Sequence, residues 1–127
     1  MKSYIKENSI IFDEADNLNL ALTLDCGQAF RWIQKPNGAW HAVVSGRAVD
    51  ITQDGERITV IGDTDERFWR TYLDLDRDYG AICEKLKADR WLNRAIKEYS
   101  GIRILRQDTW ETLCSFIISQ NNNIPRI

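Results

Sequence analysis

Three consecutive asparagines and a nearby arginine form the most distinctive polar cluster of this sequence, because they come directly after an apolar segment. Residues 115–127 read SFIISQNNNIPRI. Asn123 is a suitable N-cap for a helix that begins near Pro125, and capping uses only one or two of the asparagines. Asn121 and Arg126 then remain as an amide and a guanidinium, groups that suit base edges and phosphates. The segment therefore predicts either a helix corner held by its own side chains or a contact with nucleic acid.

A second candidate site lies at Asp25–Trp32, which reads DCGQAFRW. Gly27 has no side chain, so another molecule can approach its backbone closely. The alternative is that the glycine serves only the turn that follows a strand. Both interpretations stay open on these residues alone.

Other kinds of catalytic or metal site find little support. Asp74–Gly80 is similar to the start of a calcium loop, but its glycine comes one place late, and Lys85 stands where a bidentate glutamate is required. His41 is the only histidine, and nothing near it supports a nucleophilic site. The three widely spaced cysteines contain no C-x-x-C pair, so we expect reduced, buried thiols and neither a metal nor a cofactor.

Charges are divided unevenly along the chain. Residues 1–83 contain nine Lys/Arg against fourteen Asp/Glu, whereas residues 84–127 contain eight against five, within a total net charge of −2. The later part therefore allows a phosphate-facing surface, although a solvated basic face produces the same pattern.

The amino terminus has no apolar signal region and no run approaches a membrane span, so we expect a cytoplasmic protein, associated with the nucleoid if it is bacterial.

The hydrophobic pattern predicts an α+β fold in which strands come first and helices follow. Leucine occupies every second position from Leu18 to Leu24, which is the period of a strand. Turn signals at Asn37-Gly38, Ser45-Gly46 and Asp54-Gly55 separate short β-rich runs and predict an antiparallel meander. The expected strands are Trp40–Val44, Ala48–Thr52 and Arg57–Ile61, with an edge strand within Tyr4–Phe12, and the expected helices are Asp65–Leu75, Tyr79–Leu86 and Trp91–Tyr99.

A last helix is expected from Thr109. Asp108 is its N-cap, and Glu111 three residues later gives an aspartate version of the capping box. This helix is apolar nearly all round, so we expect it to be buried. Pro125 then begins a further helix that is cut off in its first turn, and we expect the chain to be the amino-terminal portion of a longer polypeptide.

The stretches LDCGQAFRW and GIRILRQDTWETLCSFIISQNNNIPRI, together with the spacing between them, resemble the 8-oxoguanine DNA glycosylase family of helix-hairpin-helix glycosylases. The resemblance covers most of residues 18–127. It implies a twisted antiparallel sheet with packed helices over residues 1–105, similar to half of a TATA-binding protein. Residues 106–127 would be the first helix and the truncated second helix of a helical catalytic domain. The implied activity of the whole protein is base-excision repair by a bifunctional glycosylase and abasic-site lyase that flips the damaged nucleotide out of the duplex.

The resemblance also implies roles for single residues. The backbone carbonyl of Gly27 would accept a hydrogen bond from N7–H of 8-oxoguanine, a hydrogen that normal guanine lacks. Asn121 would occupy the space that the flipped base leaves, and Arg126 would bind the estranged cytosine. The remaining DNA-binding candidates are Asn122, which would hold the corner with Asn123, and Gln28 and Phe30. The implied partner is double-stranded DNA containing 8-oxoguanine, bound by a monomer.

The nucleophilic lysine and the assisting aspartate of the family have no counterpart in these residues, because no lysine lies in a Gly-rich hairpin. We therefore expect residues 1–127 alone to be inactive. Two alternatives remain, a DNA-binding or regulatory module of the same fold without chemistry, and a sister glycosylase for alkylated purines. The second would not need Gly27 to accept from N7–H.

Overall fold

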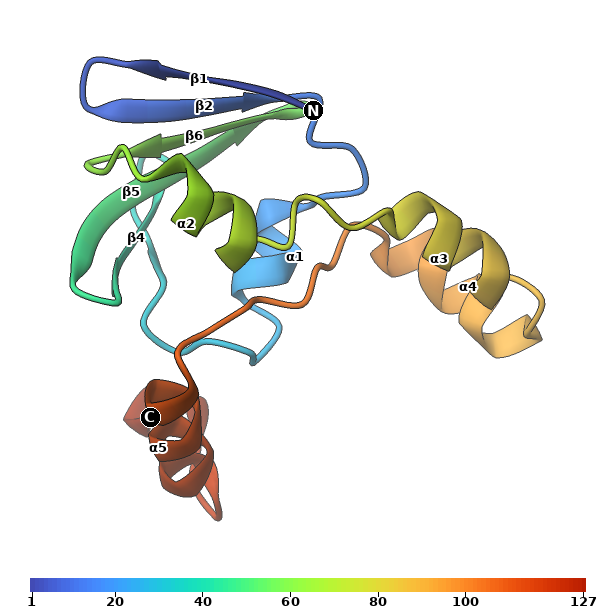
Figure 1. Ribbon diagram of the computed structural model, residues 1–127. Helices are drawn as coiled ribbons and strands as arrows, with labels where there is room; N and C mark the ends of the chain where they lie inside the picture. The colour runs from blue at the N-terminus through green and yellow to red at the C-terminus, as the bar shows by residue number, and fades with distance from the viewer.

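Residues 1–127 are all described by the computed structural model, in which six strands form one antiparallel sheet (Figure 1). The strands are β1 (Lys2–Lys6), β2 (Ser9–Asp13), β3 (Ile33–Gln34), β4 (Trp40–Val44), β5 (Arg47–Asp54) and β6 (Arg57–Ile61), in the spatial order β1-β2-β6-β5-β4-β3. The helices are α1 (Leu20–Leu24), α2 (Glu66–Tyr72), α3 (Tyr79–Leu86), α4 (Arg90–Tyr99) and α5 (Thr109–Ser119), and a short 3₁₀ turn spans Ile124–Arg126. The α+β fold and the meander are confirmed.

The amino-terminal strand differs from the prediction. Tyr4–Phe12 is a hairpin of two strands, because Glu7 adopts a left-handed backbone with φ of 53° and turns the chain. Its second strand, β2, then pairs with β6, which lies almost fifty residues later in the sequence.

One face of the sheet carries the hydrophobic core. Alternate residues of β4, β5 and β6 are buried, as the two-residue period of a strand requires. Ile51, Ile58 and Val60 are fully buried in one core cluster with Trp69 of α2 and with Leu73, the residue after α2. Figure 1 shows α2 lying over this face of the sheet. Burying each such side chain contributes about 1.5–3 kcal/mol, so this layer is the main source of stability.

Helix α1 replaces the strand that the sequence predicts at Leu18–Leu24. Asn19 is its N-cap, since the Asn19 side-chain oxygen accepts a hydrogen bond from Leu22 N at 3.0 Å. Leu20 and Leu24 are buried four residues apart on one face. Positions 20 and 24 fit both the strand period and the helix period, and the cap favours the helix.

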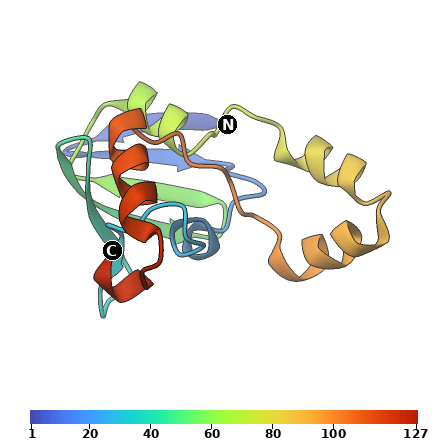
Figure 2. The ribbon, with the colours of Figure 1, turned by 90° about the horizontal axis from the view of Figure 1, so that it is seen from below.

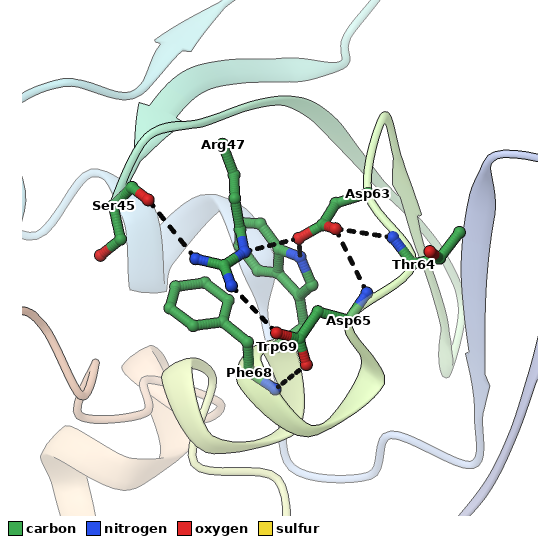
Figure 3. A network of polar contacts seen from close by, with 7 residues as sticks. All are labelled: Ser45, Arg47, Asp63, Thr64, Asp65, Phe68 and Trp69. Carbon is green, nitrogen blue, oxygen red and sulfur yellow. Dashed lines mark hydrogen bonds and ion pairs between the residues drawn. The ribbon is translucent and has the colours of Figure 1, made fainter.

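A network of charges fixes α2 against the sheet (Figure 3). Arg47 lies 2.8 Å from Asp63 and 2.9 Å from Asp65, and its guanidinium is 4.0 Å above the ring of Phe68. The Asp65 side chain caps α2 by accepting from Phe68 N. Burial raises the pKa of Asp63, but hydrogen bonds from Trp69 Nε1 and two backbone amides, with the charge of Arg47, outweigh it and hold the pKa below 3.8.

Helices α3 and α4 form a hairpin that projects from the sheet (Figures 1 and 2). Asp78 and Asp89 cap the two helices, and their predicted positions are confirmed to within one residue. Neither helix contains a fully buried residue, and Trp91 and Tyr99 are exposed on α4. The hairpin is therefore held mainly at its base.

Helix α5 begins as predicted but is not buried. Asp108 caps it by accepting from Glu111 N at 2.8 Å, whereas the Glu111 side chain pairs with Arg31 and does not complete a capping box. Phe116 is 60% exposed and Trp110 is 72% exposed. Figure 1 shows α5 standing apart from the sheet, at the opposite end from the β1–β2 hairpin. The expectation of a buried helix is therefore wrong for residues 1–127.

The polar side of α5 is turned toward the sheet domain. Glu111, Ser115 and Ser119 lie four residues apart on this side and are half-buried. The apolar residues Leu113, Phe116 and Ile117 point to the other side and are exposed. The helix thus presents to solvent the side that its composition would bury.

The three cysteines form no disulfide. All three cysteines are free thiols, but Cys26 is exposed and Cys83 and Cys114 are half-buried, which corrects the expectation of burial. None of the helices combines the length and the apolar composition needed to cross a membrane.

Candidate nucleic-acid interface

The loop at Gly27 carries a backbone carbonyl that no donor of the protein uses. Gly27 follows the end of α1, is exposed, and has a φ of +85°, a left-handed backbone that favours glycine. Neither the backbone nor any side chain donates a hydrogen bond to its carbonyl oxygen. A Cβ added at Gly27 would meet no atom within 4 Å. The protein's own packing therefore does not require glycine here beyond its φ, and the carbonyl is free to accept.

The next residue, Gln28, is directed into the protein. Its Nε2 donates to Arg103 O at 2.8 Å and lies 3.2 Å from Cys26 Sγ, while its Oε1 accepts from Leu105 N at 3.0 Å. Its main-chain oxygen accepts from Gln107 Nε2 at 2.6 Å. Gln28 therefore joins the Gly27 loop to the connector that precedes α5.

That connector, residues 101–107, has no regular secondary structure and is held by side chains. Gly101 O accepts from Asn19 N at 2.8 Å and from Thr23 Oγ1 at 3.1 Å, which fixes the connector against α1. Leu105 is buried in the core. Two sequence stretches about 75 residues apart are thereby brought together at the end of α1.

Arg103 is the buried centre of the connector. Its Nη1 donates to Asp74 O at 2.7 Å and Arg77 O at 3.1 Å, and its Nη2 donates to Asp16 O at 2.6 Å. Its guanidinium stacks 4.4 Å from the ring of Tyr79, and its Nε has no partner. Burial lowers the pKa of Arg103 from its ordinary value. This arginine fixes the base of the α3–α4 hairpin. The only sign of this structural role in the sequence is that Arg103 lies within the distinctive GIRILRQD stretch.

An aromatic wall supports the loop from behind. Trp32 is buried and donates from Nε1 to Tyr72 Oη at 3.0 Å, and the Trp32 and Tyr72 rings lie 6.4 Å apart. Burial raises the pKa of Tyr72 to about 12, so this hydroxyl stays protonated. Ala29, Phe30 and Trp32 line a pocket that continues to Gln107, Glu111 and Ser115 on the α5 side.

The loop is tied to α5 by one ion pair. Arg31 Nη1 lies 3.0 Å from Glu111 Oε1. Both side chains are partly exposed, so the pair contributes no more than about 1 kcal/mol. Its main effect is to orient the first turns of α5 relative to Gly27.

The asparagine corner differs in part from the prediction. Asn121 turns the chain with φ of 53°, and Asn122 holds the turn by donating to Ile118 O at 3.2 Å and accepting from Asn123 N at 3.0 Å. Asn123 is the N-cap position of the 3₁₀ turn, as predicted, but its side chain makes no capping hydrogen bond. The side chains of Asn121 and Arg126 are exposed and make no hydrogen bond or ion pair.

The corner comes back to the Gly27 loop through Ile124. Ile124 lines a pocket together with Leu24, Asp25, Gly27, Ala29, Phe30 and Trp32. The stretches Asp25–Trp32 and Ser115–Ile127 therefore contribute to one pocket. No lysine lines this pocket or the neighbouring one at Phe30, and no group of His, Cys, Asp or Glu side chains is placed to hold a metal ion.

Comparison with known proteins gives consistent results. The family described as 8-oxoguanine DNA glycosylase, N-terminal domain, matches residues 9–113. The N-glycosylase/DNA lyase of Saccharomyces cerevisiae is 36% identical over 126 residues, which cover 87% of this chain and 34% of the yeast protein.

Solved structures agree with the sequence matches. A structure of MBOgg1 with a low-affinity DNA ligand superposes with a TM-score of 0.93 at 42% identity, covering 98% of this chain and 44% of that one. The 8-oxoguanine glycosylase/lyase of Clostridium acetobutylicum, in complex with double-stranded DNA that has cytosine opposite 8-oxoguanine, gives a TM-score of 0.93 at 39% identity, covering 98% of this chain and 44% of that one. The chain thus spans less than half the length of these relatives.

Proposed function

The chain belongs to the 8-oxoguanine DNA glycosylase family, whose N-terminal domain it carries, and we propose that it supplies the lesion-reading part of an enzyme that excises 8-oxoguanine from duplex DNA. The observation that supports this most directly is the Gly27 carbonyl, which belongs to an exposed residue and accepts no hydrogen bond within the protein. In this proposal the enzyme is a bifunctional glycosylase and lyase, and its partner is double-stranded DNA that contains 8-oxoguanine.

Discrimination would rest on one hydrogen atom. 8-Oxoguanine carries a hydrogen on N7, whereas N7 of guanine is an acceptor. The Gly27 carbonyl would attract the first and repel the second. Leaving a buried polar group unpaired costs about 1–3 kcal/mol, so this contact would discriminate by roughly tenfold to a hundredfold.

The other exposed groups would contact the opened duplex. Asn121 would fill the space left by the flipped base, and Arg126 would bind the cytosine opposite, because both side chains are exposed and unpaired. Phe30 would lie against the flipped base from the wall of the Gly27 pocket. Asn122 would act indirectly by holding the corner, since its amide is engaged within the turn.

We propose that residues 106–127 form the start of a helical catalytic domain. The exposed apolar side of α5 supports this, because Leu113, Phe116 and Ile117 form a face that further helices would cover. The attacking lysine would come from the same domain, since no lysine lines the pockets at Gly27 and Phe30.

Borohydride trapping tests the chemistry. The complete gene product, incubated with an 8-oxoguanine duplex and borohydride, should form a covalent protein–DNA adduct through a Schiff base, and residues 1–127 alone should form none. Excision by residues 1–127 alone would contradict the assignment of the chemistry to another domain. A complete gene product that binds the lesion but never forms an adduct would favour the module without chemistry.

Substrate class and the Arg126 assignment need separate controls. A duplex with 3-methyladenine distinguishes a sister glycosylase, because that activity would not depend on the Gly27 carbonyl. Arg126→Ala should reduce the preference for cytosine opposite the lesion by roughly tenfold, as expected for one base-specific contact. Arg94→Ala is the matched control, since Arg94 is exposed on α4 and its substitution removes the same positive charge.

A further inference from the structure

Two glutamines brace irregular backbone in the same way at two places in this fold. Gln53 Nε2 donates to Leu18 O at 2.7 Å, and Gln53 Oε1 accepts from Leu20 N at 2.7 Å. In the same way, Gln28 Nε2 donates to Arg103 O at 2.8 Å, and Gln28 Oε1 accepts from Leu105 N at 3.0 Å. In each case one side-chain amide pairs with the C=O of one residue and the N–H of the residue two further along.

This pairing lets a side chain replace a neighbouring strand. Residues 101–107 lie outside the sheet, so their backbone groups have no ladder to join. Buried backbone groups without partners are costly, and the Gln28 amide supplies both a donor and an acceptor. The same residue is also held by its main chain, because Gln107 Nε2 donates to Gln28 O at 2.6 Å.

Gln28 is thereby fixed on both sides of its own Cα, directly after Gly27. The carbonyl of Gly27 and the N–H of Gln28 belong to one peptide plane, so fixing Gln28 restricts the direction in which that carbonyl points. Gly27 itself is exposed and has nothing within 4 Å of its Cβ position, so its own surroundings do not hold it.

We propose that Gln28, braced by Gln107, is the positioning residue that fixes the direction of the Gly27 carbonyl and so determines lesion discrimination. This inference rests on the proposed function of Gly27. It assigns to Gln28 an indirect role in DNA recognition, through the backbone and not through contact with the base.

The test compares binding of the complete gene product to two duplexes, one with 8-oxoguanine and one with guanine at the same site. Gln28→Ala should lower the ratio of the two affinities by roughly tenfold, because a mobile carbonyl loses its advantage for N7–H. Gln28→Glu, of nearly the same shape, removes the donor to Arg103 O and should lower the ratio in the same direction. Gln107→Ala leaves the Gln28 side chain intact and should give a smaller loss.

Gln53→Ala is the matched control. It removes the brace at Leu18 and Leu20 together with a hydrogen bond to Gly55 O, so it should lower the melting temperature at least as much but leave the affinity ratio at the wild-type value. The inference is overturned if the Gln28 variants keep the wild-type ratio, or if Gln53→Ala lowers the ratio as much as Gln28→Ala. A wild-type protein that binds both duplexes equally would instead overturn the proposed function, which separates the two failures.

Discussion

Replacing Gly101 by alanine should be among the most destabilising single changes in this domain. Gly101 has a φ of +95°, and a Cβ there would lie 2.6 Å from Asn19 N and 2.8 Å from Asn19 Cβ. These are atoms of the N-cap of α1, which lie at the base of the helix and cannot move freely. The added methyl group would therefore push the connector away from α1.

The magnitude follows from two contributions. A non-glycine residue in the left-handed region costs about 1–2 kcal/mol. Separating the two segments breaks the hydrogen bonds that Gly101 O accepts from Asn19 N and Thr23 Oγ1. Each such bond contributes about 0.5–1.5 kcal/mol to stability. We expect a total loss of about 2–5 kcal/mol, a large part of the stability of a domain of this size.

Gly38→Ala separates the two contributions. Gly38 has a φ of +88°, close to that of Gly101, but nothing lies within 4 Å of its Cβ position. Its substitution should therefore cost only the backbone strain, about 1–2 kcal/mol. Urea unfolding followed by fluorescence of the buried tryptophans gives both values. Equal losses for Gly101→Ala and Gly38→Ala would show that the close approach to Asn19 is not a feature of the folded protein.

Gly27→Ala should destabilise folding no more than Gly38→Ala, because nothing lies within 4 Å of the Cβ position at either residue. It should lower the preference for 8-oxoguanine over guanine by roughly tenfold, because the methyl group would crowd the base in the proposed site; unchanged preference in a binding assay would remove Gly27 from the site. Because the pKa of Asp63 is lowered in the folded protein, its carboxylate stabilises the fold fully above about pH 5 and loses this effect as the pH falls through the lowered pKa. Asp63→Asn should therefore make the free energy of unfolding fall less steeply with decreasing pH. Urea unfolding at a series of pH values from neutral to acidic measures this dependence. An equally steep loss in the variant would contradict it. Phe116→Ser should change the stability of residues 1–127 by less than about 0.5 kcal/mol, since Phe116 is 60% exposed, but should destabilise the complete gene product if other helices cover α5.

The strands and the helix caps were predictable because each is specified by neighbouring residues. The turn signals at Asn37-Gly38, Ser45-Gly46 and Asp54-Gly55 separate β4, β5 and β6 from what precedes them, and the glycines of all three pairs have positive φ. Aspartate caps likewise mark the starts of the helices, as Asp108 does for α5. Local chemistry is sufficient to place such elements.

The errors arise where the answer depends on distant partners. The leucines at positions 20 and 24 satisfy two periods at once, and α1 is chosen by its cap and by its contact with Gly101, some eighty residues away. The apolar composition of α5 predicts a buried helix, but its apolar side is exposed in residues 1–127, because composition does not say which residues pack against a helix. The hairpin in Tyr4–Phe12 similarly depends on the pairing of β2 with β6.

The sequence also could not separate residues that build the site from residues that are free to bind. Gln28 and Asn122 are polar residues within the distinctive stretches, as are Asn121 and Arg126. The structure separates them by one criterion, whether the polar atoms already have partners within the protein. The amides of Gln28 and Asn122 do, so they hold a loop and a corner.

In the proposed function, the groups without partners are the ones that would contact DNA. Gly27, Asn121 and Arg126 are exposed residues, and neither the Gly27 carbonyl nor the side chains of Asn121 and Arg126 have a partner within the protein. An exposed polar group loses water when a ligand covers it, so it favours a ligand that replaces the lost hydrogen bond and disfavours one that does not. This is why a carbonyl with no internal donor suits discrimination. If Gly27 O accepted a hydrogen bond from its own protein, N7–H of the lesion would have to displace that donor, and the difference in affinity between 8-oxoguanine and guanine would shrink.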